Sequence, residues 1–368
     1  AEEFCRDIIR KDFDKFVKAK QFPREVFVEM GKAGFLGAMI PEEYAGAGMS
    51  MREYIILMES LACYGGGSIA LTLTAHHSLA VAHILYAGTE DQKKTFLPKL
   101  ASGEMIGAWC LTEPDAGSDA FGKGMKTTAT LTDSGWNIRG SKQFITNGSI
   151  ADVYIVVARV VSGYPNHWKY GVFIVPKSNG RTIQCRPETN KVGMDASDTA
   201  AVTFENVEVG IDAKMEGDGK KSTYKVLNSG RVGISALACG LLRSALSEAV
   251  DYAKKRKSFG KLISEYQGVS FPLADSSAEL MACWAMVEKT AQAIDDGSLT
   301  LVELSAETKL KVTESVLSGC FNAVCTFGGY GYIKDSRATQ DFLDAFLLVI
   351  GEGTSNMQLQ TIAKMELA

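Results

Sequence analysis

Apolar residues recur at helical spacing over the first part of this 368-residue chain. In residues 54–61 and 79–85 they fall about three to four positions apart, as on the buried face of an amphipathic helix. Glycine-rich segments at 44–48 and 64–67 interrupt this spacing and separate the helices. The pattern therefore predicts an N-terminal helical domain over residues 1–105.

Beyond residue 105 the pattern changes to short β-branched runs. Residues 153–158 and 170–175 are such runs, bounded by turn residues, while 136–140 and 201–205 alternate polar and apolar positions. Most of these strands follow one another without a helical pattern between them. An antiparallel barrel or sandwich is therefore favoured over βαβ units, and it forms a middle β domain over 106–215.

Helical patterns return near Ser222 and are long. Helices are predicted over 232–257, 279–294 and 305–324, with a last one beginning near Thr354. They form a C-terminal helical domain over residues 216–368. The chain is thus an α+β multidomain protein in the order helices, sheet, helices.

Composition excludes several classes of protein. Apolar residues make up 46% and charged residues 22%, as in ordinary globular proteins. The net charge of −4 gives no reason to expect a nucleic-acid partner or an anionic membrane surface. The longest apolar run, near 233–242, is shorter than a bilayer requires, so membrane insertion is not expected.

The eight cysteines are scattered, without a C-x-x-C pair, and most lie in apolar surroundings. They are interpreted as reduced core thiols, which indicates the cytoplasm, or the mitochondrial matrix if the source is eukaryotic. The four histidines show no H-E-x-x-H spacing. No metal site is expected.

Glu352 is a candidate general base. It follows the apolar run 346–350 and lies between Gly351 and Gly353. Apolar surroundings disfavour the charged form of a carboxyl group, and flanking glycines let a substrate approach the backbone. The alternative is a solvated turn glutamate, the commoner environment for this residue.

Motifs of other enzyme classes are missing from the sequence. Segments 217–222 and 328–331 are glycine-rich, but they lack the strand-turn-helix context of a nucleotide-binding loop. No G-x-S-x-G elbow is present either. These absences disfavour a nicotinamide-dependent Rossmann enzyme, a P-loop ATPase and a serine hydrolase.

Four other segments are informative only in combination: Thr-Glu-Pro-Asp-Ala-Gly-Ser-Asp at 112–119, Phe-Ile-Thr-Asn-Gly at 144–148, Arg-Lys-Ser-Phe-Gly-Lys at 256–261 with Gln267 after it, and Phe-Gly-Gly-Tyr-Gly-Tyr at 327–332. Each alone is typical of a turn, hairpin, helix end or loop. In this order, and ending at Glu352-Gly353-Thr354, they resemble the acyl-CoA dehydrogenase family. The resemblance begins at Pro-Glu-Glu-Tyr-Ala-Gly-Ala-Gly, residues 41–48, and covers nearly the whole chain.

This resemblance implies a helical domain, a β-barrel-like middle domain and a C-terminal four-helix bundle. It also implies bound FAD, a homotetramer and an electron-transfer flavoprotein as partner. The implied reaction introduces an α,β-double bond into an acyl-CoA thioester. Glu352 would remove the α-proton and the flavin would accept the β-hydride, while the Glu352 N–H and a flavin ribityl hydroxyl would hold the thioester oxygen.

Further roles follow from the resemblance, motif by motif. Arg231 would lie beside the substrate and the catalytic loop, although a structural salt-bridge role is equally open. Gly230 occupies the position from which some relatives provide the base, which leaves Glu352 as the base and gives room for a branched or cyclic acyl group. Ser118 would contact both substrate and cofactor. The cofactor contacts implied by the resemblance are Trp109, Leu111 and Thr112 (isoalloxazine), Gly117 and Ser118 (phosphates), Phe144 (packing on the ring), Thr146 (near the hydride-accepting nitrogen), and, for an adenosine half shared between subunits, Arg256, Ser258, Phe259, Gln267, Gly328, Gly329, Thr354 and Asn356.

The sequence also departs from the family pattern. Phe144 replaces a frequent tryptophan, Cys325 replaces a glutamine before the Gly-Gly turn, and 340–344 lacks the usual arginines. His76 and His77 lie on a helix expected to border the acyl pocket, where ordinary core roles are the alternative. An acyl-CoA oxidase, a flavin monooxygenase on the same fold, or a non-catalytic acyl-CoA-binding or assembly protein are the rival functions. The length, branching or ring structure of the acyl group, the pathway and the electron acceptor are left open.

Overall fold

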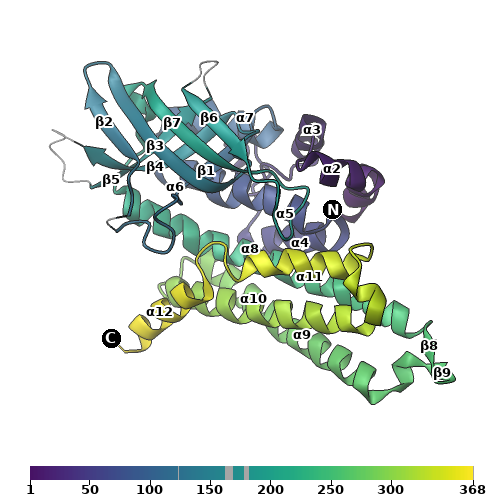
Figure 1. The fold of residues 1–368 in the computed structure, drawn as a ribbon. Helices are drawn as coiled ribbons and strands as arrows, with labels where there is room; N and C mark the ends of the chain where they lie inside the picture. Colours follow the sequence, from purple (N-terminus) through teal and green to yellow (C-terminus); the bar gives the residue numbers. More distant parts are fainter. Residues whose placement is uncertain (123, 162–168, 178–181, 368) are drawn as a thin grey trace.

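The computed structural model describes residues 1–122, 124–161, 169–177 and 182–367. Helices at the N-terminus, a curled sheet and a bundle of long helices follow one another along the chain (Figure 1). The predicted order of helices, sheet and helices is confirmed.

The N-terminal region is helical, as predicted. Two of its helices begin with capping boxes, in which a hydroxyl and the side chain three residues later satisfy each other's backbone N–H groups. Ser50 and Glu53 cap α4 in this way, and Thr89 and Gln92 cap α7. The helices are α1 (Glu2–Phe4), α2 (Phe13–Ala19), α3 (Arg24–Lys32), α4 (Met51–Ser60), α5 (Gly67–Thr74), α6 (Ala82–Ala87) and α7 (Glu90–Ser102), with a π-helical segment, η5 (Ala75–Val81), joining α5 to α6.

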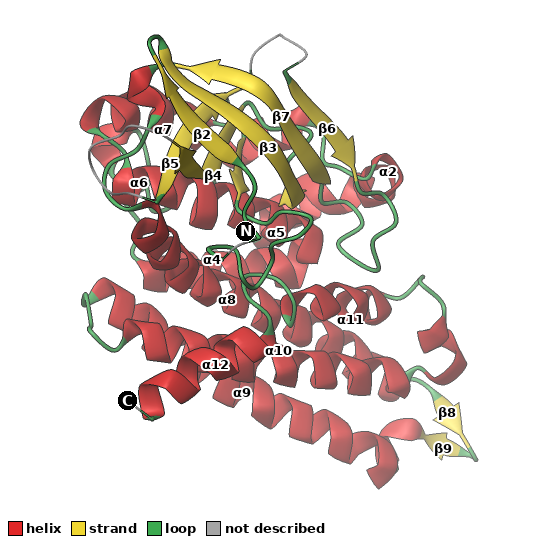
Figure 2. Ribbon diagram, turned by 60° about the vertical axis from the view of Figure 1, so that its left-hand side comes forward, coloured by secondary structure: helices red, strands yellow, loops and turns green. Residues whose placement is uncertain are grey.

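The middle region is a seven-stranded sheet that curls over the N-terminal helices (Figure 2). Its strands are β1 (Gly107–Cys110), β2 (Thr128–Thr132), β3 (Gly135–Thr146), β4 (Val153–Val161), β5 (Tyr170–Pro176), β6 (Ile183–Pro187) and β7 (Thr199–Val209). The order is β1-β4-β2-β3-β7-β6, with β5 also on β4. Four of these strands were predicted from their patterns, whereas β1, β2 and β6 were not.

The sheet is mixed, whereas the sequence pattern favoured an antiparallel one. Strand β4 runs parallel to both β1 and β2, and the remaining pairs are antiparallel. Gly107 lies opposite Val153 and Thr128 lies opposite Arg159, so β1 and β2 occupy successive parts of β4. The loop 111–127 therefore leaves the sheet between two strands of the same direction. It carries several of the predicted cofactor contacts.

The C-terminal region is built on α8 (Gly219–Ala253), α9 (Gln267–Asp295), α10 (Leu301–Thr326) and α11 (Arg337–Leu348), with α12 (Ser355–Glu366) at the end. Asp218 caps α8 by accepting from the N–H groups of Lys220 and Lys221. Helix α8 packs against α4 as well as against its own bundle, so one apolar core joins the two helical regions. A hairpin of β8 (Lys257–Ser258) and β9 (Lys261–Leu262) projects from the bundle end far from the sheet (Figures 1 and 2).

Two helical stretches, Gly67–Ala87 and Gly219–Ala253, are long and apolar enough to cross a bilayer by length and composition. Neither stretch is an uninterrupted apolar run in the sequence, because polar residues occur within both. Of their most apolar windows, 89% and 83% are buried inside the fold. Both stretches are central core helices in this structure.

Candidate active site

Glu352 lies in the tight loop between α11 and α12. It adopts φ +53°, a left-handed conformation that is unusual for a non-glycine residue, and Gly353 follows with φ +93°. The surrounding backbone fixes the loop, because Gly351 N donates to Leu347 O (2.8 Å) and Ser355 N donates to Val349 O (3.1 Å). A strained residue held by its surroundings is typical of a functional site.

The Glu352 carboxylate is enclosed. The residue as a whole is only partly buried, but its Oε2 atom is inaccessible and has no hydrogen-bond partner among the described residues. Burial raises the pKa of the Glu352 carboxyl to about 7, while the positive charges of Lys309 and Arg231 act in the opposite direction. This environment fits a proton acceptor that works near neutral pH.

Gly230 in α8 lies directly against this carboxylate. A Cβ at position 230 would lie 2.5 Å from Glu352 Oε2 and 3.1 Å from Leu79 Cδ2. The missing side chain therefore makes room for Glu352. In this structure Glu352 and Leu79 fill the space next to Gly230. Room for a branched or cyclic acyl group beside Gly230 therefore stays a prediction.

Arg231 is buried beside the same loop. Its Nη1 donates to Asn228 Oδ1 (3.0 Å), and its Nε has no hydrogen-bond partner among the described residues. Burial lowers the pKa of Arg231, and the charge of Glu352 counteracts this effect. Because the structure records no ion pair for Arg231 within its described part, the salt-bridge alternative finds no support.

The predicted isoalloxazine contacts Leu111 and Thr112 have a fixed backbone. Lys142 Nζ donates to Leu111 O (2.9 Å), and Gln143 N donates to Thr112 O (2.9 Å). Lys142 also forms a buried ion pair with Glu113 (2.8 Å). Strand β3 thus holds this loop through a buried lysine that sequence reasoning missed. In the sequence, this residue is visible only as a lysine within the strand segment 136–146.

Phe144 and Thr146 lie at the end of β3, as predicted. The pairing of β3 with β7 shifts register between Lys142 and Ile145, and Phe144 has φ +57°. This irregularity leaves Phe144 68% exposed, while Thr146 is partly buried. In the neighbouring loop, no described residue other than the chain neighbours of Gly117 has an atom within 4 Å of the place where its Cβ would lie, and Ser118 is exposed.

Trp109, like Leu111, is mostly buried. Its Nε1 donates to His83 Nδ1 (2.9 Å), and His83 Nε2 forms a further bond with Ser222 Oγ (2.9 Å). Because Nδ1 accepts, the proton of the neutral imidazole is on Nε2. His83, which the sequence did not single out, therefore anchors Trp109, and the cofactor role of Trp109 stays a prediction.

A second group of predicted cofactor residues lies at the far end of the bundle. Arg256, Ser258, Gly328 and Gly329 line one pocket of about 380 Å³ between the end of α8 and the end of α10. Phe259, at the tip of the β8–β9 hairpin, is 96% exposed, and Gln267 at the start of α9 is also exposed. Figures 1 and 2 show this end pointing away from the sheet, so one chain does not bring the two groups together.

Thr354 and Asn356 stay with Glu352 at the start of α12. Thr354 caps that helix by accepting from Met357 N (3.3 Å), and Asn356 is exposed. Their cofactor contacts stay predictions. Cys325, the departure from the family pattern, is an exposed free thiol close to the far pocket.

His76 and His77 are ordinary core residues. His76 Nδ1 accepts from Gly107 N (3.1 Å), and His77 Nε2 accepts from Met39 N (3.1 Å). Burial lowers the pKa of His76 to about 3 and that of His77 to about 4, so both are neutral at physiological pH. Their polar atoms bond to backbone groups, which favours the structural role.

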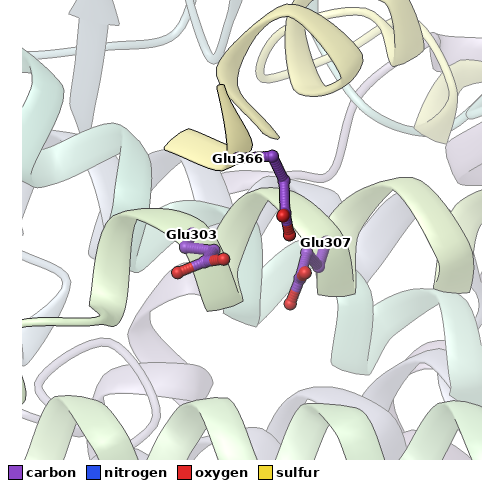
Figure 3. Close-up of side chains that lie close together, drawn as sticks. All are labelled: Glu303, Glu307 and Glu366. Atoms are coloured by element: carbon purple, nitrogen blue, oxygen red, sulfur yellow. The ribbon is translucent and has the colours of Figure 1, made fainter. Parts of the chain in front are cut away.

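Glu303 and Glu307 of α10 and Glu366 of α12 have carboxylate oxygens within 4.8 Å of one another. Figure 3 shows the three side chains close together. All three are partly or fully exposed, and such acidic groups are common on surfaces without an ion. The cluster does not by itself define a metal centre.

The helical, curled-sheet and helical-bundle regions, with a buried carboxylate on the loop before the last helix, define the acyl-CoA dehydrogenase fold. Models of the acyl-CoA dehydrogenase N-terminal, middle and C-terminal domains match residues 1–104, 108–207 and 217–367. The chain therefore belongs to the acyl-CoA dehydrogenase family.

Individual relatives match over the whole chain. An acyl-CoA dehydrogenase of Bacillus subtilis is 36% identical, covering 98% of this chain and 96% of the relative. A subunit of the caffeyl-CoA reductase-Etf complex of Acetobacterium woodii is 32% identical, with 99% and 96% covered.

Solved structures agree with this assignment. The butyryl-CoA dehydrogenase of Megasphaera elsdenii superimposes with a TM-score of 0.92 at 33% identity, covering 100% of this chain and 96% of that one. A glutaryl-CoA dehydrogenase of Mycobacterium smegmatis in complex with FADH2 gives 0.92 at 27% identity, with 99% and 92% covered.

Proposed function

We propose that this protein is an FAD-dependent acyl-CoA dehydrogenase that converts an acyl-CoA thioester to the 2-enoyl-CoA. One observation carries the proposal: the Glu352 carboxylate is enclosed and its Oε2 has no partner among the described residues, while two buried cations lie close by. A carboxylate in such a place can take a proton from carbon, because neither water nor a permanent hydrogen bond competes for that oxygen.

Glu352 acts as the base for the α-proton of the thioester. Its pKa of about 7 keeps a large fraction ionised at neutral pH and makes the ionised form a stronger base than an exposed glutamate. Removal of the proton develops negative charge on the thioester oxygen, which needs hydrogen-bond donors. The backbone N–H of Glu352 has no backbone acceptor in the described part of the chain, so it is available for this role.

The residues on the middle domain fit a planar cofactor. The exposed ring of Phe144 can stack on a flat ring system, and the backbone at Leu111 and Thr112 is held in place for hydrogen bonding. The open position beside Gly117 leaves room for a phosphate group. When bound there, FAD would supply the acceptor for the β-hydrogen, which leaves as hydride. The chain itself would orient the substrate and exclude water.

A homotetramer accounts for the second group of cofactor residues. Arg256, Ser258 and the Gly328–Gly329 turn line a pocket remote from Phe144, so they would contact the adenosine half of FAD bound mainly by a neighbouring chain. The electron-transfer flavoprotein is proposed as the acceptor. The Etf complex named for the Acetobacterium woodii relative supports this partner.

The central test replaces Glu352 with glutamine, which keeps the shape of the side chain. Glu352→Gln is expected to bind FAD and acyl-CoA, while bleaching of the flavin under anaerobic conditions slows by about 10²-fold or more. Glu307→Gln, a change of a partly exposed glutamate in α10, is the control and should bleach like the wild type. Near-normal bleaching by Glu352→Gln would refute the assignment of the base.

The same assay separates the rival functions. Reduced protein that is re-oxidised slowly by air but rapidly by an electron-transfer flavoprotein supports a dehydrogenase, and fast re-oxidation by air supports an oxidase. A protein that purifies without flavin and cannot be loaded with FAD supports the non-catalytic alternative. Straight-chain, branched, cyclic and dicarboxylic CoA thioesters, compared by their bleaching rates, would define the substrate.

A further inference from the structure

Lys309 is the least expected residue near Glu352. It lies in the middle of α10, its side chain is fully enclosed, and its Nζ donates to Gly353 O (2.8 Å). Gly353 directly follows the proposed base, so the lysine holds the catalytic loop from a helix 44 positions earlier in the chain. A neutral side chain shares this task, because Gln358 Nε2 donates to the same carbonyl (2.9 Å).

The charge of Lys309 is unusual at this place. An enclosed ammonium group is costly unless an opposite charge compensates it, and no ion pair of Lys309 is recorded within the described residues. Burial lowers the pKa of Lys309 to about 8, and the negative charge of Glu352 is the strongest opposing influence. Lys309 and Glu352 thus influence each other's ionisation without a direct salt bridge.

Other polar groups face this pair from each neighbouring element. Arg231 of α8 adds a second positive charge, and Tyr54 of α4 interacts electrostatically with Glu352. Glu314, also on α10, accepts from Ser355 Oγ (2.5 Å) beside the loop and influences Lys309. A carbonyl acceptor could be satisfied by Gln358 alone, so the hydrogen bond does not explain why a lysine is buried here.

We propose that Lys309 is a positioning residue for the dehydrogenation, which fixes the loop through the Gly353 carbonyl and favours the ionised, proton-accepting form of Glu352 by its positive charge. The inference deepens the proposed function and rests on it, since it gives the charge a role only if Glu352 is the base. A purely structural lysine would contribute the hydrogen bond but leave the titration of Glu352 unchanged.

Three variants of the FAD-loaded enzyme separate charge from hydrogen bonding. Lys309→Met removes both, Lys309→Gln removes the charge but keeps a donor, and Gln358→Leu removes the neutral donor to the same carbonyl. The titration of Glu352 is followed by the infrared band of its protonated carboxyl, assigned by difference from Glu352→Gln. Circular dichroism and melting temperature establish that each variant folds, and Lys309→Gln decides the question if Lys309→Met does not.

Loss of a nearby positive charge is expected to raise the pKa of Glu352 by about one unit in both Lys309 variants. At pH 7 this shift reduces the ionised fraction, and with it the rate of flavin bleaching, by about fivefold, and the rate recovers near pH 9. Gln358→Leu should titrate like the wild type. Unshifted titration in the Lys309 variants, or an equal shift in Gln358→Leu, would overturn the proposal.

The infrared titration needs no turnover, so the two hypotheses fail separately. Absence of bleaching by any acyl-CoA would refute the proposed function, whatever the titration shows. Normal bleaching with a Glu352 titration that is independent of Lys309 would refute only the role of Lys309.

Discussion

Gly230 and Glu352 are in complementary contact: a Cβ on residue 230 would lie 2.5 Å from Glu352 Oε2, closer than non-bonded atoms can approach. The glycine lies in the middle of α8, where this residue type costs about 1 kcal/mol of helix stability relative to alanine. The glycine at residue 230 is therefore explained by the space that the Glu352 carboxylate needs, and not by the stability of the helix. The same contact explains why a second carboxylate at position 230 would be incompatible with the present conformation of Glu352.

Gly230→Ala should consequently impair catalysis although it favours the helix. The added methyl group has to displace the Glu352 carboxylate, and a misplacement of about 1 Å can cost about 10²-fold in rate. We expect flavin content and melting temperature close to wild type, with bleaching slowed at least tenfold. Gly233→Ala is the control in the same helix, because its Cβ would meet Ser78 Oγ at 3.1 Å and would not face Glu352. Equal rates for Gly230→Ala and the wild type would show that Glu352 does not act from this position.

From the raised pKa of Glu352 we predict how the free energy of unfolding depends on pH. The pKa is about 7 in the folded protein against 4.5 ordinarily, so between these values the folded state binds more protons than the unfolded state. The free energy of unfolding must therefore fall as the pH rises through this window. Glu352→Gln removes that contribution and should gain about 3 kcal/mol relative to the wild type between pH 4.5 and 7.5. Denaturant unfolding at both pH values measures the difference, and a gap independent of pH would contradict the assigned pKa.

Much of the fold follows from local patterns, but α11 does not. Its sequence places Asp341 and Asp344 on the buried side, where Arg337 Nε donates to Asp341 Oδ1 (2.7 Å) and Met194 N donates to Asp344 Oδ1 (2.5 Å). Carboxylates at inward positions break the apolar periodicity from which a helix is recognised. The partner of Asp344 is distant in sequence, so no local signal announces that contact, whereas Arg337 lies one helical turn before Asp341.

Some residues of the candidate site can likewise be found from the sequence, whereas others are found only in the structure. Glu352 and Gly230 could be selected from the sequence, because the motifs that flank them are local. Lys309 and Lys142 could not, since a lysine on a helix or strand is ordinarily solvated, and the carbonyls that they hold belong to other segments. The parallel pairing of β4 with β1 and β2 is equally non-local.

For the buried His83 we expect the free energy of unfolding to depend on pH in the direction opposite to that expected for Glu352. Burial lowers the pKa of His83 to about 3 from 6.5, so the unfolded state binds more protons at acidic pH. The free energy of unfolding therefore falls as the pH drops below about 6.5. His83→Gln can still accept from Trp109 and donate to Ser222 but does not titrate. It should be less sensitive to acid than the wild type, by about 2 kcal/mol between pH 6.5 and 5.

Other buried groups also make the free energy of unfolding depend on pH. The difference between His83→Gln and the wild type isolates the contribution of His83. Burial raises the pKa of Asp341 to about 6 and that of Asp344 to about 7, and these groups favour the folded state as the pH falls. They are unchanged in His83→Gln, so the difference from the wild type reports His83 alone. An identical pH dependence of the two proteins would mean that His83 stays protonatable in the fold.

The buried pair Lys142–Glu113 predicts a link between stability and cofactor binding. Lys142→Met leaves Glu113 enclosed without its cation and Leu111 O without its donor, and loss of one partner of a buried ion pair costs about 3–5 kcal/mol. Because the same lysine holds the backbone at Leu111, the variant should also release FAD more readily, measured by flavin fluorescence on dilution. Lys126→Met removes an exposed pair with Asp115 in the same loop and is expected to cost at most about 1 kcal/mol. If both variants lose the same stability and retain FAD equally, the buried lysine does not support the cofactor loop.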